Sequence, residues 1–342
     1  MTARGSLRRA ALVLALPLGA CHGKPSPTAH AEPKPRATTT AEPHPVSREP
    51  LEPLPEVPAL DARTVALGRR LFHEPRLSGD GKVACSSCHD LGKSGADSKP
   101  LSLGVSGKSG LVNAPTVYNA SLNFVQFWDG RAATLEDQVG GPITNPIEMG
   151  SSWDQALAAL RADPSYVADF GALPGGLTEA NVRRAVADFE RTLLTRGSAF
   201  DRFLAGDEQA LAPEARSGYE MFKSVGCIAC HQGRNVGGNM FQRFGVLGDY
   251  FKDRGHVSEA DYGRYNVTHN EADRYVFRVP SLRNVTRTAP YFHDGSAATL
   301  PQAVQVMARY QLGRKLSDEQ VSAIIAFLGA LAGNQQPAGA KI

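Results

Sequence analysis

The sequence predicts a mainly α-helical protein made of two similar halves. Apolar residues recur at helical spacing in several segments, whereas the alternation of apolar and polar residues that marks a half-buried strand is scarce. Short motifs of the first half return in the second half at a constant offset, which indicates an internal repeat. At 342 residues the chain is long enough for two domains of ordinary size.

The helical segments can be placed from their caps and apolar faces. Asp61 is in position to cap the first helix, and Ser317 and Gln320 form a capping box at the start of the last one. Further helices are expected at 152–161, 178–195 and 213–224. Long loops connect these segments.

Four of the five cysteines lie in two copies of one pattern. Residues 85–89 read Cys-Ser-Ser-Cys-His, and residues 227–231 read Cys-Ile-Ala-Cys-His. A Cys-x-x-Cys-His run is the attachment signature of a c-type haem, in which both thiols bind the porphyrin and the histidine ligates the iron. Zinc sites and disulfides are the alternatives, but neither copy has the second Cys/His pair that a zinc finger needs. Two covalent haem c groups are therefore expected, one on Cys85, Cys88 and His89 and one on Cys227, Cys230 and His231.

The offset between the halves is constant for two other motifs. Residues 114–119 resemble residues 279–284, and residues 129–135 resemble residues 294–300, each pair being 165 residues apart. The two haem motifs are only 142 residues apart. The second half therefore carries about 23 additional residues after its haem motif, which we expect within 235–265.

The N-terminus indicates export from the cytoplasm. Arg4, Arg8 and Arg9 precede an apolar run that is too short to span a bilayer, a pattern typical of a signal peptide. Residues 18–21 resemble a bacterial lipoprotein processing box, in which Cys21 would carry the lipid. An ordinary signal peptide with a spare thiol is the alternative. The sequence predicts a periplasmic protein whose only membrane attachment is this N-terminal lipid.

The next segment is rich in proline and poor in apolar residues, so a semi-extended tether is expected, with His22, His30 and His44 in solvent. The net charge of +3 gives no indication of a nucleic-acid partner. Four parts are predicted: a signal peptide at 1–20, a tether at 21–58, and two cytochrome c-like haem domains at 59–205 and 206–336.

The repeat makes the two irons unequal. A haem iron that is held by one histidine has one axial position left, and its occupant decides between electron transfer and reaction with a small molecule. Met307 lies on the apolar side of an expected helix, and the 165-residue offset places Pro142, which has no side-chain donor, opposite it. One iron is therefore expected to be ligated by Met307 and the other to be open. Met149 and Met240 are competing ligands, and a packing role for Met307 is the other interpretation.

Three further residues are candidates for the chemistry. Trp128 corresponds to His293 in the repeat and is a candidate for electron transfer between the haems, although a core role is common for tryptophan. Gln138 and Glu148 are polar groups near the expected open iron. A carboxylate can move a proton between the two oxygens of a peroxide, and apolar neighbours would raise the pKa of Glu148 toward a useful range. A surface acid is the alternative for Glu148.

Together these motifs resemble the bacterial di-haem cytochrome c peroxidases, within a larger group that includes the methylamine-utilisation di-haem enzymes. The resemblance covers residues 60–333 and rests on both haem motifs and on segments 71–72, 75–78, 113–116, 127–131 and 289–295. It implies a peroxidatic haem on His89, an electron-accepting haem on His231 and Met307, and Trp128 between them. It also implies Gln138 and Glu148 in the distal pocket.

The resemblance further implies a calcium ion, bound by Asn113 and by the backbone carbonyls of Thr288 and Pro290. Oxygen ligands of this kind suit Ca²⁺. The implied reaction is reduction of hydrogen peroxide to water, with electrons from a small c-type cytochrome or a cupredoxin. Homodimers are common in the family, so the resemblance also implies a homodimer.

Two other functions stay open from the sequence. One is a di-haem electron-transfer protein without peroxide turnover. The other is a di-haem oxidase that modifies a partner protein, as the methylamine-utilisation relatives do. Those relatives have tyrosine where Met307 stands, and Tyr310, one helical turn later, is the residue that would compete for the iron.

The chain departs from the family pattern in one loop. Many relatives carry a histidine between the first haem motif and residues 113–116, where it caps the peroxidatic iron in the oxidised state. Here Val105 stands in that place, and no histidine occurs from 90 to 230. His73 precedes the haem motif and is expected to be structural. The sequence therefore predicts a peroxidatic haem that needs no reductive activation.

Overall fold

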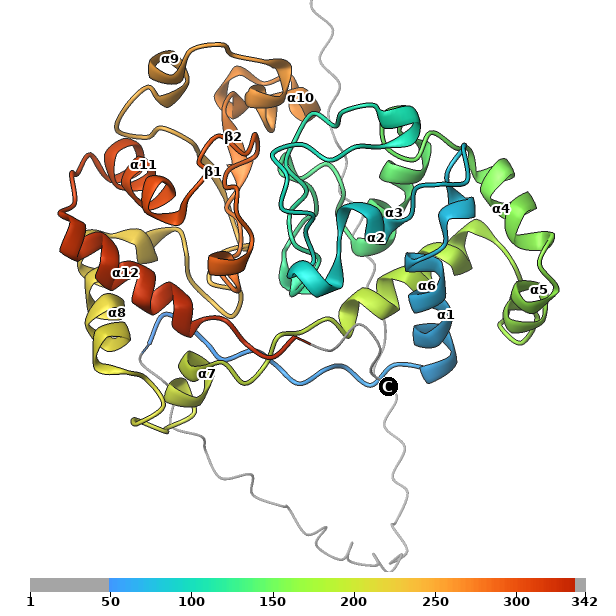
Figure 1. The fold of residues 1–342 in the computed structure, drawn as a ribbon, viewed down its shortest axis with the longest axis horizontal. Coiled ribbons are helices and arrows are strands. Elements are labelled where there is room, and N and C mark those ends of the chain that lie inside the picture. The colour runs from blue at the N-terminus through green and yellow to red at the C-terminus, as the bar shows by residue number, and fades with distance from the viewer. Residues whose placement is uncertain (1–48, 336–342) are drawn as a thin grey trace, which may run out of the picture. The chain divides into compact units, whose positions relative to one another are not determined.

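The computed structural model describes residues 49–335. The predicted signal peptide, Cys21, the tether as far as residue 48 and the three tether histidines lie outside the described residues. The described chain is mainly helical, as predicted, and its one ladder of paired strands joins β1 (Phe241–Arg243) to β2 (Val276–Arg278) in antiparallel register (Figure 1). None of the helices within 49–335 has the length and hydropathy of a membrane-spanning segment.

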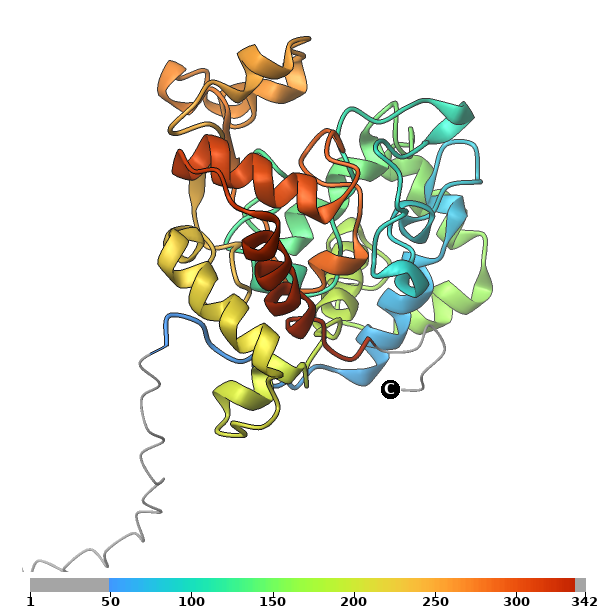
Figure 2. The same cartoon turned by 60° about the vertical axis from the view of Figure 1, so that its left-hand side comes forward.

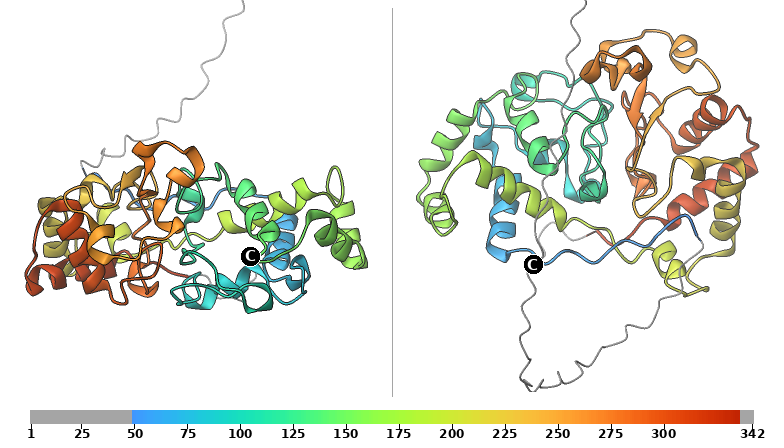
Figure 3. Two further views of the ribbon diagram at one scale, coloured as in Figure 1. Left: turned by 90° about the horizontal axis from the view of Figure 1, so that it is seen from above. Right: turned by 180° about the vertical axis from the view of Figure 1, so that it is seen from behind.

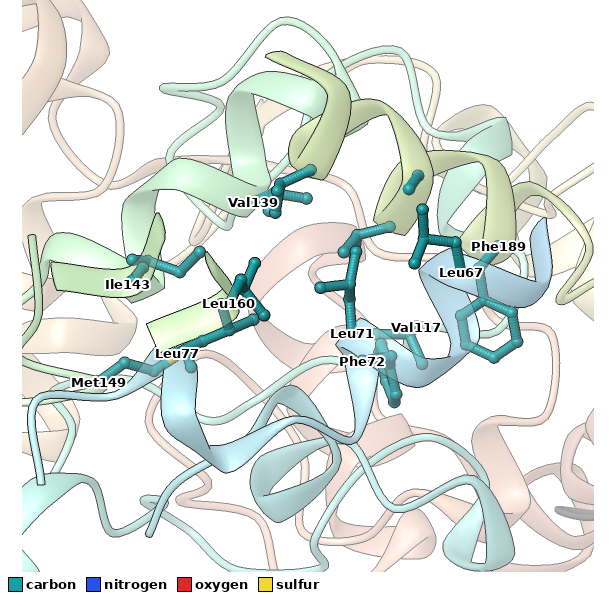
Figure 4. Packing of buried hydrophobic residues seen from close by; sticks show 14 of the residues in the cluster. Leu67, Leu71, Phe72, Leu77, Val117, Val139, Ile143, Met149, Leu160 and Phe189 are labelled. Atoms are coloured by element: carbon teal, nitrogen blue, oxygen red, sulfur yellow. The ribbon is translucent and has the colours of Figure 1, made fainter. Parts of the chain in front are cut away.

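The first half is built on α1 (Ala62–Phe72) and α6 (Glu179–Arg191), which pack against each other. Asp61 caps α1 by accepting a hydrogen bond from the Thr64 N–H, as the sequence predicted. The side chains of Phe72 and Phe189 meet in the core between the two helices, with ring centroids 5.4 Å apart (Figure 4). The other helices of this half are α2 (Cys85–Cys88), α3 (Leu135–Thr144), α4 (Trp153–Arg161) and α5 (Pro164–Gly171).

The second half repeats this kind of packing with α8 (Pro213–Val225) and α12 (Asp318–Ala330). Figure 2 shows α12 between α8 and α11 (Leu300–Leu312). Phe327 of α12 lies at the centre of an aromatic cluster with Phe200, Tyr219 and Phe222. The remaining helices are α7 (Ala199–Leu204), α9 (Tyr250–Arg254) and α10 (Tyr265–Thr268). The helices expected at 152–161 and 213–224 and the Ser317 capping box are confirmed. The helix expected at 178–195 is also present but ends earlier, at Arg191.

Glycine allows the close approach of both helix pairs. A Cβ on Gly68 would overlap the carbonyl oxygen of Ala185, and a Cβ on Gly218 would overlap that of Ala323. A side chain at either position would therefore force two helices apart.

We expect Gly218→Ala to destabilise the protein by about 1–3 kcal/mol, the usual cost of overpacking a core. Gly329→Ala is the matched control, because Gly329 lies in the last turn of α12 and a Cβ there meets nothing within 4 Å. This control should be neutral or stabilising by up to about 1 kcal/mol, since alanine favours the helix. Denaturant unfolding of the two variants measures the difference, and equal stabilities would contradict the packing argument.

The predicted tether needs correction at its C-terminal end. Leu51 is fully buried in the second core, and the Pro50 carbonyl accepts a hydrogen bond from Gly233 N–H at 3.0 Å. The Leu54 N–H donates to Asp201, and the side chain of Glu49 accepts from the Tyr219 hydroxyl. The folded part therefore starts by residue 49, not near Leu60, because a few apolar and backbone groups suffice to hold an extended segment against the second core. The right panel of Figure 3 shows this segment in blue.

A buried network joins the two halves. Asn119 and Asn284 occupy equivalent places in the two sequence motifs, and the Nδ2 of each donates to the Thr195 hydroxyl, at 2.9 and 3.0 Å. Asn235 Nδ2 donates to the Asn119 carbonyl at 3.2 Å. Asn119, Asn284 and Thr195 have no exposed surface, so these hydrogen bonds are shielded from solvent and hold the two halves together.

The segment between β1 and β2 reaches from the second half to the first. Arg264, beside α10, donates to the carbonyls of Asp129 and Gly130 at 3.1 and 2.9 Å, and its guanidinium lies over the ring of Phe241. Figure 1 and the left panel of Figure 3 show this segment in orange beside the first half.

Candidate haem-binding sites

The first haem motif lines a cavity of about 450 Å³. Cys85, Cys88 and His89, from α2 and the residue that follows it, are all part of the lining. His89 Nδ1 lies 3.3 Å from the Gly95 carbonyl oxygen, and burial lowers the pKa of this histidine. A neutral imidazole that donates from Nδ1 leaves Nε2 for a metal, so the residues present fit an iron-bound haem.

The second motif lines a separate cavity of about 240 Å³. Cys227, Cys230 and His231 belong to its lining. Burial lowers the pKa of His231 to about 4, and its Nδ1 lies near the carbonyls of Val236 and Pro280 without a hydrogen bond of good geometry. This buried neutral imidazole also fits a metal ligand.

The alternatives to haem find no support in the described residues. All four motif cysteines are free thiols, so neither motif forms a disulfide. Within 49–335, the only group of three or more His, Cys, Asp or Glu side chains with ligand atoms within 4.8 Å of one another is Asp261, His293 and Asp294. Neither haem motif is part of such a group, and Arg254 forms ion pairs with both aspartates of that one.

Met307 lines the second cavity together with His231. Tyr310 does not line it: its hydroxyl donates to Asp253 at 2.9 Å and its ring packs edge-on against Tyr250. Of the competing methionines, Met149 lies in the first cavity's lining and in the first core, and Met240 lines neither cavity. The structure therefore brings Met307, and neither Tyr310 nor Met240, to the cavity of His231.

The first cavity has a different set of polar groups. Pro142 and Gln138 of α3 line it, and no described residue forms a hydrogen bond with the Gln138 side chain. Glu148 lines it too and accepts a 2.7 Å hydrogen bond from Asn145 Nδ2. Burial raises the pKa of Glu148, in the direction that the sequence predicted, while the Arg131 charge and the Asn145 bond oppose the rise.

A second acid in this cavity was missed by sequence reasoning. Glu190 of α6 is only 5% exposed, and burial raises its pKa to about 8. It follows Val186 by four residues and so lies on the buried face of the helix. This position on the helix could have identified Glu190 from the sequence, because a carboxylate on a buried face is unusual unless it has a role or a partner.

Trp128 lies between the two cavities and lines both. Its Nε1–H donates to the Asn113 carbonyl at 2.9 Å, and its ring meets that of His293 edge to face at 6.4 Å. Asn113 N–H donates in turn to the His293 carbonyl at 2.7 Å. The two residues that the repeat places in equivalent positions thus meet between the halves.

The loop that lacks a histidine packs against the segment of Glu148. Val105 is buried in the first core, and its N–H donates to the Glu148 carbonyl at 2.8 Å. A Cβ on Gly104 would overlap the Ile147 carbonyl, so the two segments touch closely. His73 lines neither cavity and packs against the ring of Phe72, which agrees with a structural role.

The three residues named for calcium also lie together. Asn113, Thr288 and Pro290 all line the second cavity, and the Ala289–Pro290 peptide is cis. Asn113 Nδ2 donates to the Lys99 carbonyl at 2.8 Å, so its Oδ1 is the atom left for a ligand. The hydrogen bonds of the described residues include none to the carbonyls of Thr288 and Pro290. These oxygens are the kind of donor that a hard cation takes.

Part of the second half closes the first cavity. Glu259, Ala260, Gly263 and Asn266, from the segment between β1 and β2, belong to its lining. The sequence predicted about 23 additional residues within 235–265. It gave no indication that residues of this region line the cavity of the first haem motif.

Comparison with known proteins identifies the family. The family described as di-haem cytochrome c peroxidase matches residues 62–209. The chain is 47% identical over 291 residues to the cytochrome c peroxidase Ccp of Escherichia coli K12, covering 84% of this chain and 62% of the relative. It is 45% identical over 291 residues to the cytochrome c551 peroxidase of Nitrosomonas europaea, covering 84% of this chain and 86% of the relative.

A solved structure of a MauG-like protein associated with microbial copper homeostasis has a TM-score of 0.70 and 27% identity, covering 82% of this chain and 93% of that one. MauG-like proteins are thus also similar, but the peroxidases are closer in sequence. This confirms the predicted class of enzyme, an oxidoreductase that acts on peroxide. The chain belongs to the bacterial di-haem cytochrome c peroxidases.

Proposed function

We propose that this chain reduces hydrogen peroxide to water in the first cavity, with electrons taken up at the second. The asymmetry of the two cavities carries the proposal: Met307 lines the second, whereas Pro142 and Glu148 line the first, and the methionine that also lines the first, Met149, is packed in the first core. The haems, when bound, supply the redox chemistry. The name of the Nitrosomonas relative supports a small cytochrome as donor, and a cupredoxin is the alternative donor.

Glu148 and Gln138 act on the peroxide itself in this proposal. Asn145 holds the Glu148 carboxylate at 2.7 Å, and both Glu148 and Gln138 line the cavity. A carboxylate with a raised pKa can accept a proton from one peroxide oxygen and return it to the other. The Gln138 amide is a donor for the same oxygens. Trp128, which lines both cavities, lies on the route between them.

Two covalent haems in two repeated cytochrome c-like domains are part of the proposal. Asn119 and Asn284 both have positive φ angles, of 61° and 60°, at the 165-residue offset. The isolated bridges Gln126–Ala132 and Tyr291–Ala297 are separated by the same offset. These pairs support an internal repeat. Phe200 already packs in the second core, which supports a domain boundary slightly before the expected one at 205.

The first cavity accepts peroxide without prior reduction of the second haem in this proposal. Val105 has no group that can ligate iron, and its packing and hydrogen bond to the Glu148 carbonyl hold the loop in the first core.

The test uses fully oxidised holo-protein, reduced cytochrome c and hydrogen peroxide. Turnover without a lag, at the same rate with and without prior reduction of the protein, is expected. A lag that reduction removes would contradict the open first site but not the peroxidase. Absence of turnover under both conditions would favour an electron carrier. Resting-state EPR on the same sample gives the ligation of each iron.

We also propose that Asn113, Thr288 and Pro290 bind Ca²⁺ and thereby hold the wall between the cavities. Asn113 is hydrogen-bonded to Trp128 and His293, so the ion would fix both. Chelation is expected to lower turnover by about 10- to 100-fold, since a 1 Å misplacement of reacting groups has effects of that order. Steady-state assays should recover with Ca²⁺ and not with Mg²⁺, which demands a smaller octahedral site. Asn113→Ala should remove this response, and a chelator effect that persists in this variant would contradict the site.

The location proposed is the periplasm, with the lipid on Cys21 as the only membrane attachment. The two Cys-x-x-Cys-His motifs support an exported protein, and Cys21 itself lies outside the described residues. A homodimer is proposed by analogy with the family. Mass spectrometry of the mature N-terminus and light scattering of the purified protein test the two points.

A further inference from the structure

Arg278, the last residue of β2, is a buried cation without an anionic partner. It is 3% exposed, and burial alone lowers the pKa of its guanidinium to about 10. Its Nε donates to the Phe127 carbonyl at 3.2 Å, and its backbone N–H donates to the Trp128 carbonyl at 2.8 Å. Among the described residues, no Asp or Glu forms an ion pair with it, and neither Nη atom has a hydrogen bond.

Other arginines of the second half show how this protein normally buries a guanidinium. Arg283 is fully buried and pairs with Asp201 at 2.7 Å, with two backbone carbonyls taking further donors. Arg254 pairs with Asp261 at 2.7 Å and with Asp294. A buried charge is costly unless it is paired, so the lack of a carboxylate at Arg278 calls for an anion that the polypeptide does not supply.

Arg278 lies in the lining of both cavities, as Trp128 does. Of the five N–H donors of a guanidinium, the Phe127 carbonyl takes one, which leaves the four on the Nη atoms. Four donors in a planar fork match two carboxylates. The hydrogen bonds to Phe127 and Trp128 hold this fork in the wall between the two cavities.

We propose that Arg278 binds a propionate carboxylate of each haem and so bridges the two haem sites. The propionates are the anionic groups of a haem, whereas hydrogen peroxide carries no charge at neutral pH and would not compensate the cation. The inference rests on the presence of both haems and not on the substrate that is turned over. A cation shared by the two groups favours the reduced state of each iron.

The test is a potentiometric titration of holo-protein without peroxide. In Arg278→Gln, the oxidation equilibrium of both haems should shift at least tenfold toward the oxidised form. This shift corresponds to a fall of about 59 mV in the reduction potential of each haem, since each is a one-electron couple. Arg274→Gln is the matched control: it removes a positive charge four residues away, and Arg274 lines neither cavity. This control should leave both potentials unchanged.

A fall in the reduction potential of one haem only, or of neither, would overturn the proposal that Arg278 bridges the two haem sites. If the Arg278→Gln protein does not carry two haems per chain, the titration is carried out on Arg278→Lys instead. A lysine ammonium keeps the charge but not the planar fork, so the potential of at least one haem should fall, and two wild-type potentials would again overturn the proposal. Because no peroxide is present, this result is independent of whether the chain is a peroxidase.

Discussion

Glu148→Gln is expected to lower peroxide turnover by about two to four orders of magnitude, the usual contribution of a positioned acid–base group. The glutamine keeps the size of the side chain and its place beside Asn145. It cannot accept a proton, so peroxide would bind but not react at the normal rate. Steady-state assays with reduced cytochrome c give kcat and KM, and the loss should appear in kcat. The absorption spectrum should stay that of the wild type.

Glu190→Gln is the matched control for this prediction. Glu190 lines the same cavity, but burial raises its pKa to about 8, which favours the protonated form of this carboxyl. A glutamine is a close substitute for a protonated glutamate, so turnover at pH 7 should change little. Equal losses in the two variants, or a larger loss at Glu190, would contradict the assignment of Glu148 as the proton acceptor.

The pH dependence of turnover follows from the same carboxylate. Glu148 must be ionised to accept a proton, and burial raises its pKa, while the Arg131 charge and the Asn145 hydrogen bond favour the ionised form. Turnover should therefore fall on the acid side, with a midpoint above the roughly 4.3 of an ordinary glutamate. This acid limb should be absent from the residual activity of Glu148→Gln. An unchanged limb in the variant would assign it to another group.

The sequence predicted the features that depend on neighbouring residues. The caps at Asp61 and Ser317 were found because a cap is a local pattern, and both haem motifs are contiguous. Met307 and Pro142 could be compared because the constant offset of the repeat aligns the two halves. Met307 lines the second cavity and Pro142 the first, as expected.

The features that the sequence did not predict depend on distant contacts. Leu51 is buried only because an extended segment lies against α8 and its neighbours, which its proline-rich surroundings do not indicate. Glu259 and Asn266 come from the second half yet line the first cavity. Arg278 lies in a strand of three residues, too short to show a periodic pattern, so its burial could be seen only in the fold.

Met307→Ala is expected to lower the reduction potential of the haem at the second site and so to weaken its capacity to accept electrons. A thioether ligand raises the potential of a haem, and axial ligands together span about 0.8 V, so a fall on the order of 0.1 V or more is expected. Turnover with reduced cytochrome c should decrease by at least about 50-fold, because 0.1 V corresponds to that factor in a one-electron equilibrium. Met307→His should keep two axial ligands but also lower the potential.

Tyr310→Phe is the control that separates a peroxidase from an oxidase of the MauG-like kind. The Tyr310 hydroxyl donates to Asp253, on α9, and the side chain does not line the cavity of His231. Removing this hydroxyl should cost one hydrogen bond and leave the haem spectrum and potential unchanged. If the spectrum instead changed in Tyr310→Phe and not in Met307→Ala, the tyrosine would be the axial ligand. The electron-accepting role of the second site would then be wrong, because its potential would no longer be set by sulfur.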